Sequence, residues 1–297
     1  MTMNRRRALG LGGAALAALH PSASRAQSPA PRIVASFSIL ADMAQELAPA
    51  GAQVTALVGA DADAHVYEPS PADGKRLARA DLVVVNGLGF EGWIERMVKV
   101  SGYRGTLAVA SQGIQPRKGD HRGADPHAWQ DLALARRYAT NLSAAFALRW
   151  PQQRDEIARR GADYLARIDG LDRQVRDWLG VVPRPQRRVI TSHDAFGYFG
   201  AAYGVDFLAA QGWNTHSEPS AAAVARLIRQ IRKEGVRAIF IENISDPRLV
   251  ERIAREGGVR VGGTLYSDAL SGPDGPAATY LRMIEHNARG LAAALQA

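Results

Sequence analysis

The chain has 297 residues, no cysteine, and 37 basic against 29 acidic side chains, which gives a formal net charge of +8. Four of the arginines lie in the first 26 residues, and without them the count is 33 basic against 29 acidic, a net charge of +4. So small an excess argues against nucleic acid as a partner. The absence of cysteine excludes a disulfide-stabilised fold, but about 270 residues bury a sufficient core without disulfides.

The first 26 residues have the pattern of an export signal. Three arginines at positions 5–7 precede an apolar run, Ala8–Leu19, that is shorter than the roughly 20 residues needed to span a bilayer. Small residues, Ser24 and Ala26, then occupy the two cleavage-determining positions. We expect a signal peptide at residues 1–26, and the adjacent arginines favour the twin-arginine type. Because no cysteine follows for lipid attachment, we expect a soluble periplasmic protein.

Strand-like and helix-like segments alternate in the first half of the chain. The short apolar run Asp81–Asn86 is typical of a buried parallel strand, and Ser70 and Pro71 form a helix start. The predicted strands are Arg32–Ser36, Gln53–Val58, Asp81–Asn86 and Thr106–Ala110, and the predicted helices are Ile39–Leu47, Pro71–Ala80 and 130–149.

A long helix is predicted over Gln152–Leu179. This segment contains no proline, and its apolar residues recur at helical spacing until Pro183 and Pro185 end the pattern. A helix of this length would extend about 42 Å at 1.5 Å per residue.

The second half repeats the alternation. The predicted strands are Arg188–Thr191, Val205–Leu208, Val236–Ile241 and Val259–Gly263, and the predicted helices are Ala221–Glu234, Pro247–Glu256 and Pro276–Leu295. Alternating strands and helices indicate parallel sheets. We therefore predict an α/β protein with two lobes, each a parallel sheet flanked by helices, joined by the long helix. The expected boundaries are 27–150 for the first lobe, 151–182 for the linking helix and 183–297 for the second lobe.

Four side chains are candidates for a common site: His65, His127, His193 and Asp268. Three of them, His65, His193 and Asp268, follow a predicted strand within a few residues. Ligands of open α/β sheets bind beyond the carboxyl ends of the strands, so these side chains are expected to converge on a cleft. Two would come from the first lobe and two from the second.

Three imidazoles and one carboxylate form a suitable tetrahedral set for zinc. Nitrogen and oxygen ligands also accept manganese or iron(II), so the residue types alone leave the metal open. The separations between the four residues match no short-range metal motif. Because protons compete with metal for histidine, we expect the affinity to fall below about pH 6.5.

Several segments along the chain resemble the solute-binding proteins of zinc/manganese ABC importers. They are Asp63–Ser70, Asp125–Trp129, Ser192–Phe199, Ser217–Ser220, Glu242-Asn243 and Tyr266–Asp268. The resemblance implies two α/β lobes bridged by a rigid helix, with the metal between the lobes.

On the same resemblance, the metal ligands are His65, His127, His193 and Asp268. Histidine at the third position, His193, is usual in zinc-handling members, whereas manganese-handling members often have glutamate there. The resemblance further implies a monomer that is not an enzyme. It would bind Zn²⁺, or alternatively Mn²⁺ or iron, and pass it to an inner-membrane permease with a cytoplasmic ATPase.

Two features depart from the zinc-handling pattern. The stretch Gln115–Ala124 is short and holds only His121, where many members have a long histidine-rich loop, and the usual second-lobe disulfide is missing. Both departures leave manganese open. Four further residues were considered. We expect His121 to be exposed in its loop and His286 to be structural. His216 could touch the cleft, and Glu68 could support the first ligand or serve as an alternate one.

A zinc hydrolase is the rival from another class. Such an enzyme needs an open coordination position and a nearby general base, for which Asp194 or Glu68 would be candidates. The chain contains no helix-borne pair of histidines and no nucleophile motif, which argues against this alternative.

Overall fold

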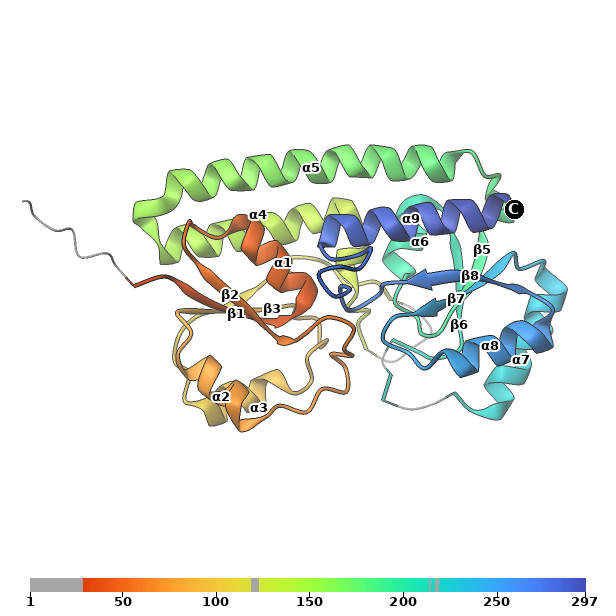
Figure 1. Ribbon diagram of the computed structural model, residues 1–297, viewed down its shortest axis with the longest axis horizontal. Helices are drawn as coiled ribbons and strands as arrows, with labels where there is room; N and C mark the ends of the chain where they lie inside the picture. Colours follow the sequence, from red (N-terminus) through yellow and green to blue (C-terminus); the bar gives the residue numbers. More distant parts are fainter. Residues whose placement is uncertain (1–28, 119–122, 214, 217–218) are drawn as a thin grey trace, which may run out of the picture.

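The computed structural model describes residues 29–118, 123–213, 215–216 and 219–297. The expected signal peptide and His121 lie outside these ranges, as do Ser217 and Glu218. Two lobes lie side by side, each with its own sheet, and helices α4, α5 and α9 run along one side of both (Figure 1). No helix within the described ranges is long and apolar enough to cross a membrane.

The first sheet is parallel and has the strand order β2-β1-β3-β4. Its strands are β1 (Arg32–Phe37), β2 (Gln53–Val58), β3 (Leu82–Val85) and β4 (Leu107–Val109). The central strand β3 is buried along its whole length, as its continuous apolar sequence predicts.

The second sheet repeats the arrangement with the order β6-β5-β7-β8, again all parallel. Its strands are β5 (Arg188–Thr191), β6 (Asp206–Ala209), β7 (Ala238–Glu242) and β8 (Arg260–Leu265). Every predicted strand is found within two residues of its expected bounds. The two-lobed α/β architecture is thereby confirmed.

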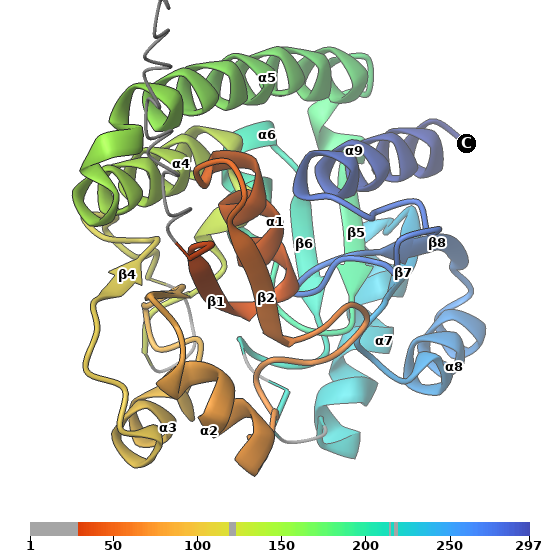
Figure 2. The ribbon, with the colours of Figure 1, turned by 60° about the vertical axis from the view of Figure 1, so that its left-hand side comes forward.

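Helices cover both faces of the sheets. They are α1 (Ser38–Leu47), α2 (Pro71–Ala78), α3 (Ile94–Ser101), α4 (Leu132–Arg149), α5 (Arg154–Gly180), α6 (Gly197–Tyr203), α7 (Ala221–Glu234), α8 (Pro247–Gly257) and α9 (Tyr280–Gln296). Figure 2 shows α2 and α3 on one lobe, and α7 and α8 on the other, at the side away from α5.

Some predicted helices are corrected. The last helix begins at Tyr280 rather than Pro276, because the Thr279 hydroxyl accepts the backbone N–H of Arg282 and caps it there. Helix α2 ends at Ala78, two residues early. Helices α3 and α6 were not predicted.

Helix α5 connects the lobes. It begins at Arg154, after a 3-10 turn at Pro151–Gln153, and packs against α4, α9 and α1 along its length. Its buried residues recur every three or four positions, and Gly161 lets Ser143 of α4 approach closely. One hydrophobic core runs beneath these helices through both lobes, with a smaller cluster between β7 and helices α7 and α8. A shared core of this kind disfavours a wide hinge between the lobes.

Candidate metal centre

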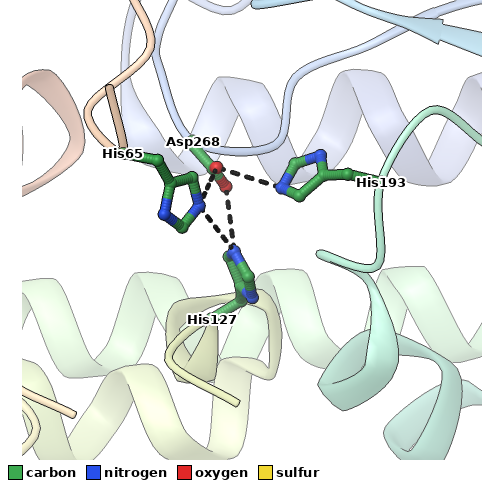
Figure 3. A group of neighbouring side chains, drawn as sticks. All are labelled: His65, His127, His193 and Asp268. Atoms are coloured by element: carbon green, nitrogen blue, oxygen red, sulfur yellow. Dashed lines mark hydrogen bonds and ion pairs between the residues drawn. The ribbon is translucent and has the colours of Figure 1, made fainter. Parts of the chain in front are cut away.

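The structure brings all four predicted residues to one point between the sheets. His65 lies in the loop after β2, His193 directly follows β5, and Asp268 follows β8. His127 precedes a short 3-10 helix, Ala128–Gln130, that leads into α4. One ligand atom from each side chain lies within 4.8 Å of all the others (Figure 3).

The three imidazoles present their Nε2 atoms to the Asp268 carboxylate. His65 Nε2 lies 3.1 Å and His193 Nε2 lies 3.2 Å from Oδ2 of Asp268. His127 Nε2 lies 3.7 Å from Oδ1 and 3.4 Å from Nε2 of His65. These separations suit four donors around one small cation, with metal–ligand distances near 2.0–2.2 Å after slight adjustment.

The cluster is closed off from solvent. His127, His193 and Asp268 are fully buried, and His65 is 5% exposed. Both Asp268 oxygens and His193 Nε2 lie in ion-pair contacts but have no well-directed hydrogen bond to any described residue. Burying polar atoms without hydrogen bonds is costly, and a cation held between them would remove that cost. The donor set therefore fits a divalent transition metal.

Two further carboxylates orient the histidines from behind. Oδ1 of Asp125 lies 2.9 Å from Nδ1 of His127, and it also accepts the His127 backbone N–H. Glu242, at the end of β7, accepts the backbone N–H of His193 and places Oε2 2.7 Å from its Nδ1. Each carboxylate favours a proton on Nδ1, which leaves Nε2 for a metal. Both residues lie in segments singled out from the sequence, but their roles were not predicted.

These carboxylates determine which histidines carry charge in the metal-free site. Burial lowers the pKa of His127, but Asp268 and Asp125 outweigh burial and raise it to about 9. Burial also opposes charge on His193, yet Glu242 and Asp268 raise its pKa well above 6.5. Protons therefore compete with metal at both histidines well above pH 6.5. The fall in affinity expected below about pH 6.5 from the free-histidine pKa should therefore extend to higher pH.

The other two candidate ligands, Asp268 and His65, have lowered pKa values, so metal would not have to displace a proton from them at neutral pH. Burial alone would raise the pKa of Asp268, but His127 and His193 hold it well below 3.8. Burial lowers the pKa of His65, and Asp268 opposes this only in part. In the metal-free site, protons are therefore held preferentially on His127 and His193 rather than on His65 or Asp268.

Aromatic rings form one wall of the site. Phe90 meets the His65 ring at 4.7 Å and the Trp129 ring at 4.9 Å between centroids. Trp129 Nε1 and Gln130 Nε2 both donate to the carbonyl of Ser267, at 3.0 and 2.8 Å, and so fix the loop that carries Asp268. The wall keeps water from the ligands on this side, which strengthens the interactions of the carboxylate.

The remaining candidate residues lie outside the cluster. A pocket of about 520 Å³ reaches His65, and the exposed residues Glu68 and His216 line it. His286 places Nε2 3.1 Å from the Thr264 carbonyl and packs against an aromatic ring, as a structural residue would. Asp194, the other base considered for a hydrolase, lines a separate cavity beside β6.

Two α/β lobes on a connecting helix, with a buried cluster of ligand-type side chains between them, define a two-lobed binding protein. The profile of one protein family, zinc-uptake complex component A (ZnuA) periplasmic, matches residues 33–294. The chain belongs to this family of metal-binding, substrate-binding components of ABC importers.

Curated relatives and a solved structure support this membership. The chain is 32% identical to the zinc-binding protein TroA of Treponema pallidum, over 89% of this chain and 89% of TroA. It is 32% identical to the iron-binding protein YfeA of Yersinia pestis, over 85% and 82% of the two chains. The manganese-binding lipoprotein MntA of Bacillus subtilis is 30% identical, over 89% and 90%. A solved TroA structure superposes with a TM-score of 0.86, covering 90% of this chain and 99% of that one at 30% identity.

Proposed function

We propose that this protein captures a divalent transition metal, zinc by preference, at His65, His127, His193 and Asp268, and delivers it to an ABC permease. The observation that carries this proposal is the buried cluster itself, whose ligand atoms all lie within 4.8 Å of one another. We further propose that it acts as a soluble periplasmic monomer, with lobes at residues 27–150 and 183–297 on a linking segment at 151–182.

The choice of zinc rests on ligand chemistry. Three imidazole nitrogens and one carboxylate oxygen suit tetrahedral zinc, whereas manganese favours more oxygen ligands. The named relatives bind zinc, iron or manganese, so membership of the family does not decide the metal. Within the four ligands, His193 is the position at which a carboxylate would most directly favour manganese.

A complete coordination sphere around the metal ion favours its retention by the protein. Four protein ligands leave no open position for a reacting water, which favours holding the ion over chemistry on a substrate. This is the reason to propose transport rather than hydrolysis. The ion would then be released when one ligand segment moves away from the others.

Competitive titration of the metal-free protein with zinc and manganese at pH 7.4 tests the proposal. We expect one zinc per chain with nanomolar or tighter affinity, much weaker manganese, and a shift toward manganese in His193→Glu. His286→Ala is the matched control, because it removes a histidine outside the cluster and should leave zinc binding unchanged. Comparable affinities for both metals would make this a manganese or broad-metal protein. No stoichiometric metal binding would refute the proposal.

A further inference from the structure

The loop that carries His65 belongs to the first lobe and contacts the second. It runs between β2 and α2 without regular secondary structure. On the first lobe its anchor is the carbonyl of Ala64, which accepts a 2.9 Å hydrogen bond from Trp93 Nε1. The residues just before Ala64 are instead bonded to the second lobe.

Asp61 makes three of these contacts. Its backbone N–H donates to the Leu270 carbonyl at 2.9 Å. Its carboxylate accepts the side-chain amide of Asn243 at 3.0 Å and the backbone N–H of Gly272 at 3.3 Å. We call Asp61, Asn243, Leu270 and Gly272 the Asp61 clasp.

Asp61 has an unusual backbone conformation for its residue type. Its φ is +51°, in the left-handed region that glycine occupies most readily and where other residues are uncommon. An aspartate at this position accepts a conformational cost that glycine would avoid. The two carboxylate bonds across the cleft account for the presence of the side chain.

A second aspartate reinforces the connection. Asp63 accepts the backbone N–H of His65 at 2.8 Å through one oxygen and the Thr215 hydroxyl at 2.5 Å through the other. The backbone of His65 is therefore linked through Asp63 to the second lobe, two residues beyond the clasp.

The clasp joins the two segments that carry His65 and Asp268 to a third segment that supports His193. Asp61 precedes His65 in its loop, and Leu270 and Gly272 follow Asp268 in another. Asn243 is adjacent to Glu242, whose carboxylate holds His193. His65 Nε2 and Asp268 Oδ2 are 3.1 Å apart, so separating these two loops would pull two of the candidate ligands away from a shared ion.

We propose that the Asp61 clasp sets the rate at which bound metal leaves the site, with Asp61 and Asn243 acting as positioning residues. This inference rests on the proposed function. Asp61 is exposed and Asn243 is partly exposed, so water can replace their bonds when the loops part. Opening the clasp frees the His65 loop from the loop that follows Asp268, and a docked permease can reach this contact because it is exposed.

Zinc dissociation from the loaded full-length protein tests the proposal, with a fluorescent chelator capturing the released ion. Asn243→Ala removes the bond to Asp61 and a 3.3 Å bond to the Ala269 carbonyl without changing charge, and we expect dissociation at least about fivefold faster, the equivalent of one net hydrogen bond. Asp61→Gly removes both carboxylate contacts while suiting the backbone, and we expect about 5–30-fold faster release. Because both variants remove the bond between Asp61 and Asn243, the double variant should release zinc more slowly than the product of the two single effects predicts.

Asn141→Ala is the matched control. Asn141 also donates to two backbone carbonyls, Ala110 and Gln112, but these bonds stay within the first lobe. Its dissociation rate should equal that of the unmodified protein.

Rates for Asn243→Ala and Asp61→Gly within twofold of the control would overturn the proposal. So would a double variant whose effect is the product of the single effects. If the unmodified protein binds no zinc, the proposed function fails; if it binds and the variants release zinc normally, only the clasp fails. Asp61→Gly keeps the test decisive should Asn243→Ala not fold.

Discussion

Metal binding at neutral pH should release two protons, and the affinity should rise steeply with pH. His127, with a pKa of about 9, and His193, with a pKa well above 6.5, are both protonated in the metal-free site near pH 7. His65 and Asp268 have lowered pKa values and contribute no proton. Displacing two protons raises the binding constant about 100-fold per pH unit, which is about 2.7 kcal/mol per unit. The slope should flatten above about pH 9, where His127 loses its proton.

Calorimetric titration with zinc in two buffers of different ionisation enthalpy measures the number of protons released. We expect a value near two at pH 7. Glu242→Gln removes the carboxylate that faces Nδ1 of His193, so the release should fall toward one. Asp42→Asn is the matched control, because it neutralises a carboxylate that bonds Tyr280 rather than a ligand. The charge assignment would be refuted if the unmodified protein released less than one proton. It would also be refuted if the zinc affinity did not change between pH 6 and pH 8.

Four further predictions concern stability. Zinc at 1,000 times its dissociation constant should stabilise the fold by about 4 kcal/mol, seen as a higher Tm that EDTA reverses. For the metal-free protein, the raised His127 pKa contributes stability below pH 6.5 that is lost as pH rises through about 9, so its Tm should fall over that range. Ser70→Ala removes the α2 capping box and should lower the free energy of unfolding in urea by about 1 kcal/mol. Gly200→Ala would place a Cβ 2.5 Å from the Val205 carbonyl and should cost about 1–3 kcal/mol in the same assay, unlike Gly170→Ala, where space is open.

The regular part of the fold was predictable because its patterns are local. Strands β1 to β8 are short apolar runs, and the long helix α5 buries every third or fourth residue. Helices α3 and α6 were not predicted because their sequences carry weak helix signals. Neither has a side-chain N-cap, and α6 is seven residues long with glycine at two of them. Its buried aromatic residues pack on the core, so tertiary contacts rather than propensity stabilise it.

The site was predictable to the extent that its residues follow strands. His65, His193 and Asp268 lie beyond strand ends, where parallel sheets place their ligands. Asp125 and His127 are two residues apart, so their contact could have been predicted from the local sequence. The pairing of Glu242 with His193 was not, because it depends on which strands are neighbours in the second sheet. The contacts of Asp61 are still harder to predict from the sequence, because its partners lie in the other lobe.

The distribution of the four ligands along the chain bears on when the site comes into being. His65 and Asp268 stand near opposite ends of the described chain, and the second sheet must be complete before Asp268 can meet the histidines. A nascent chain still emerging from the ribosome, or threaded unfolded through a translocon, therefore has no competent site. On the proposed function, metal would bind only after the last strand and helix have folded, so a bound ion would indicate that synthesis and folding are complete.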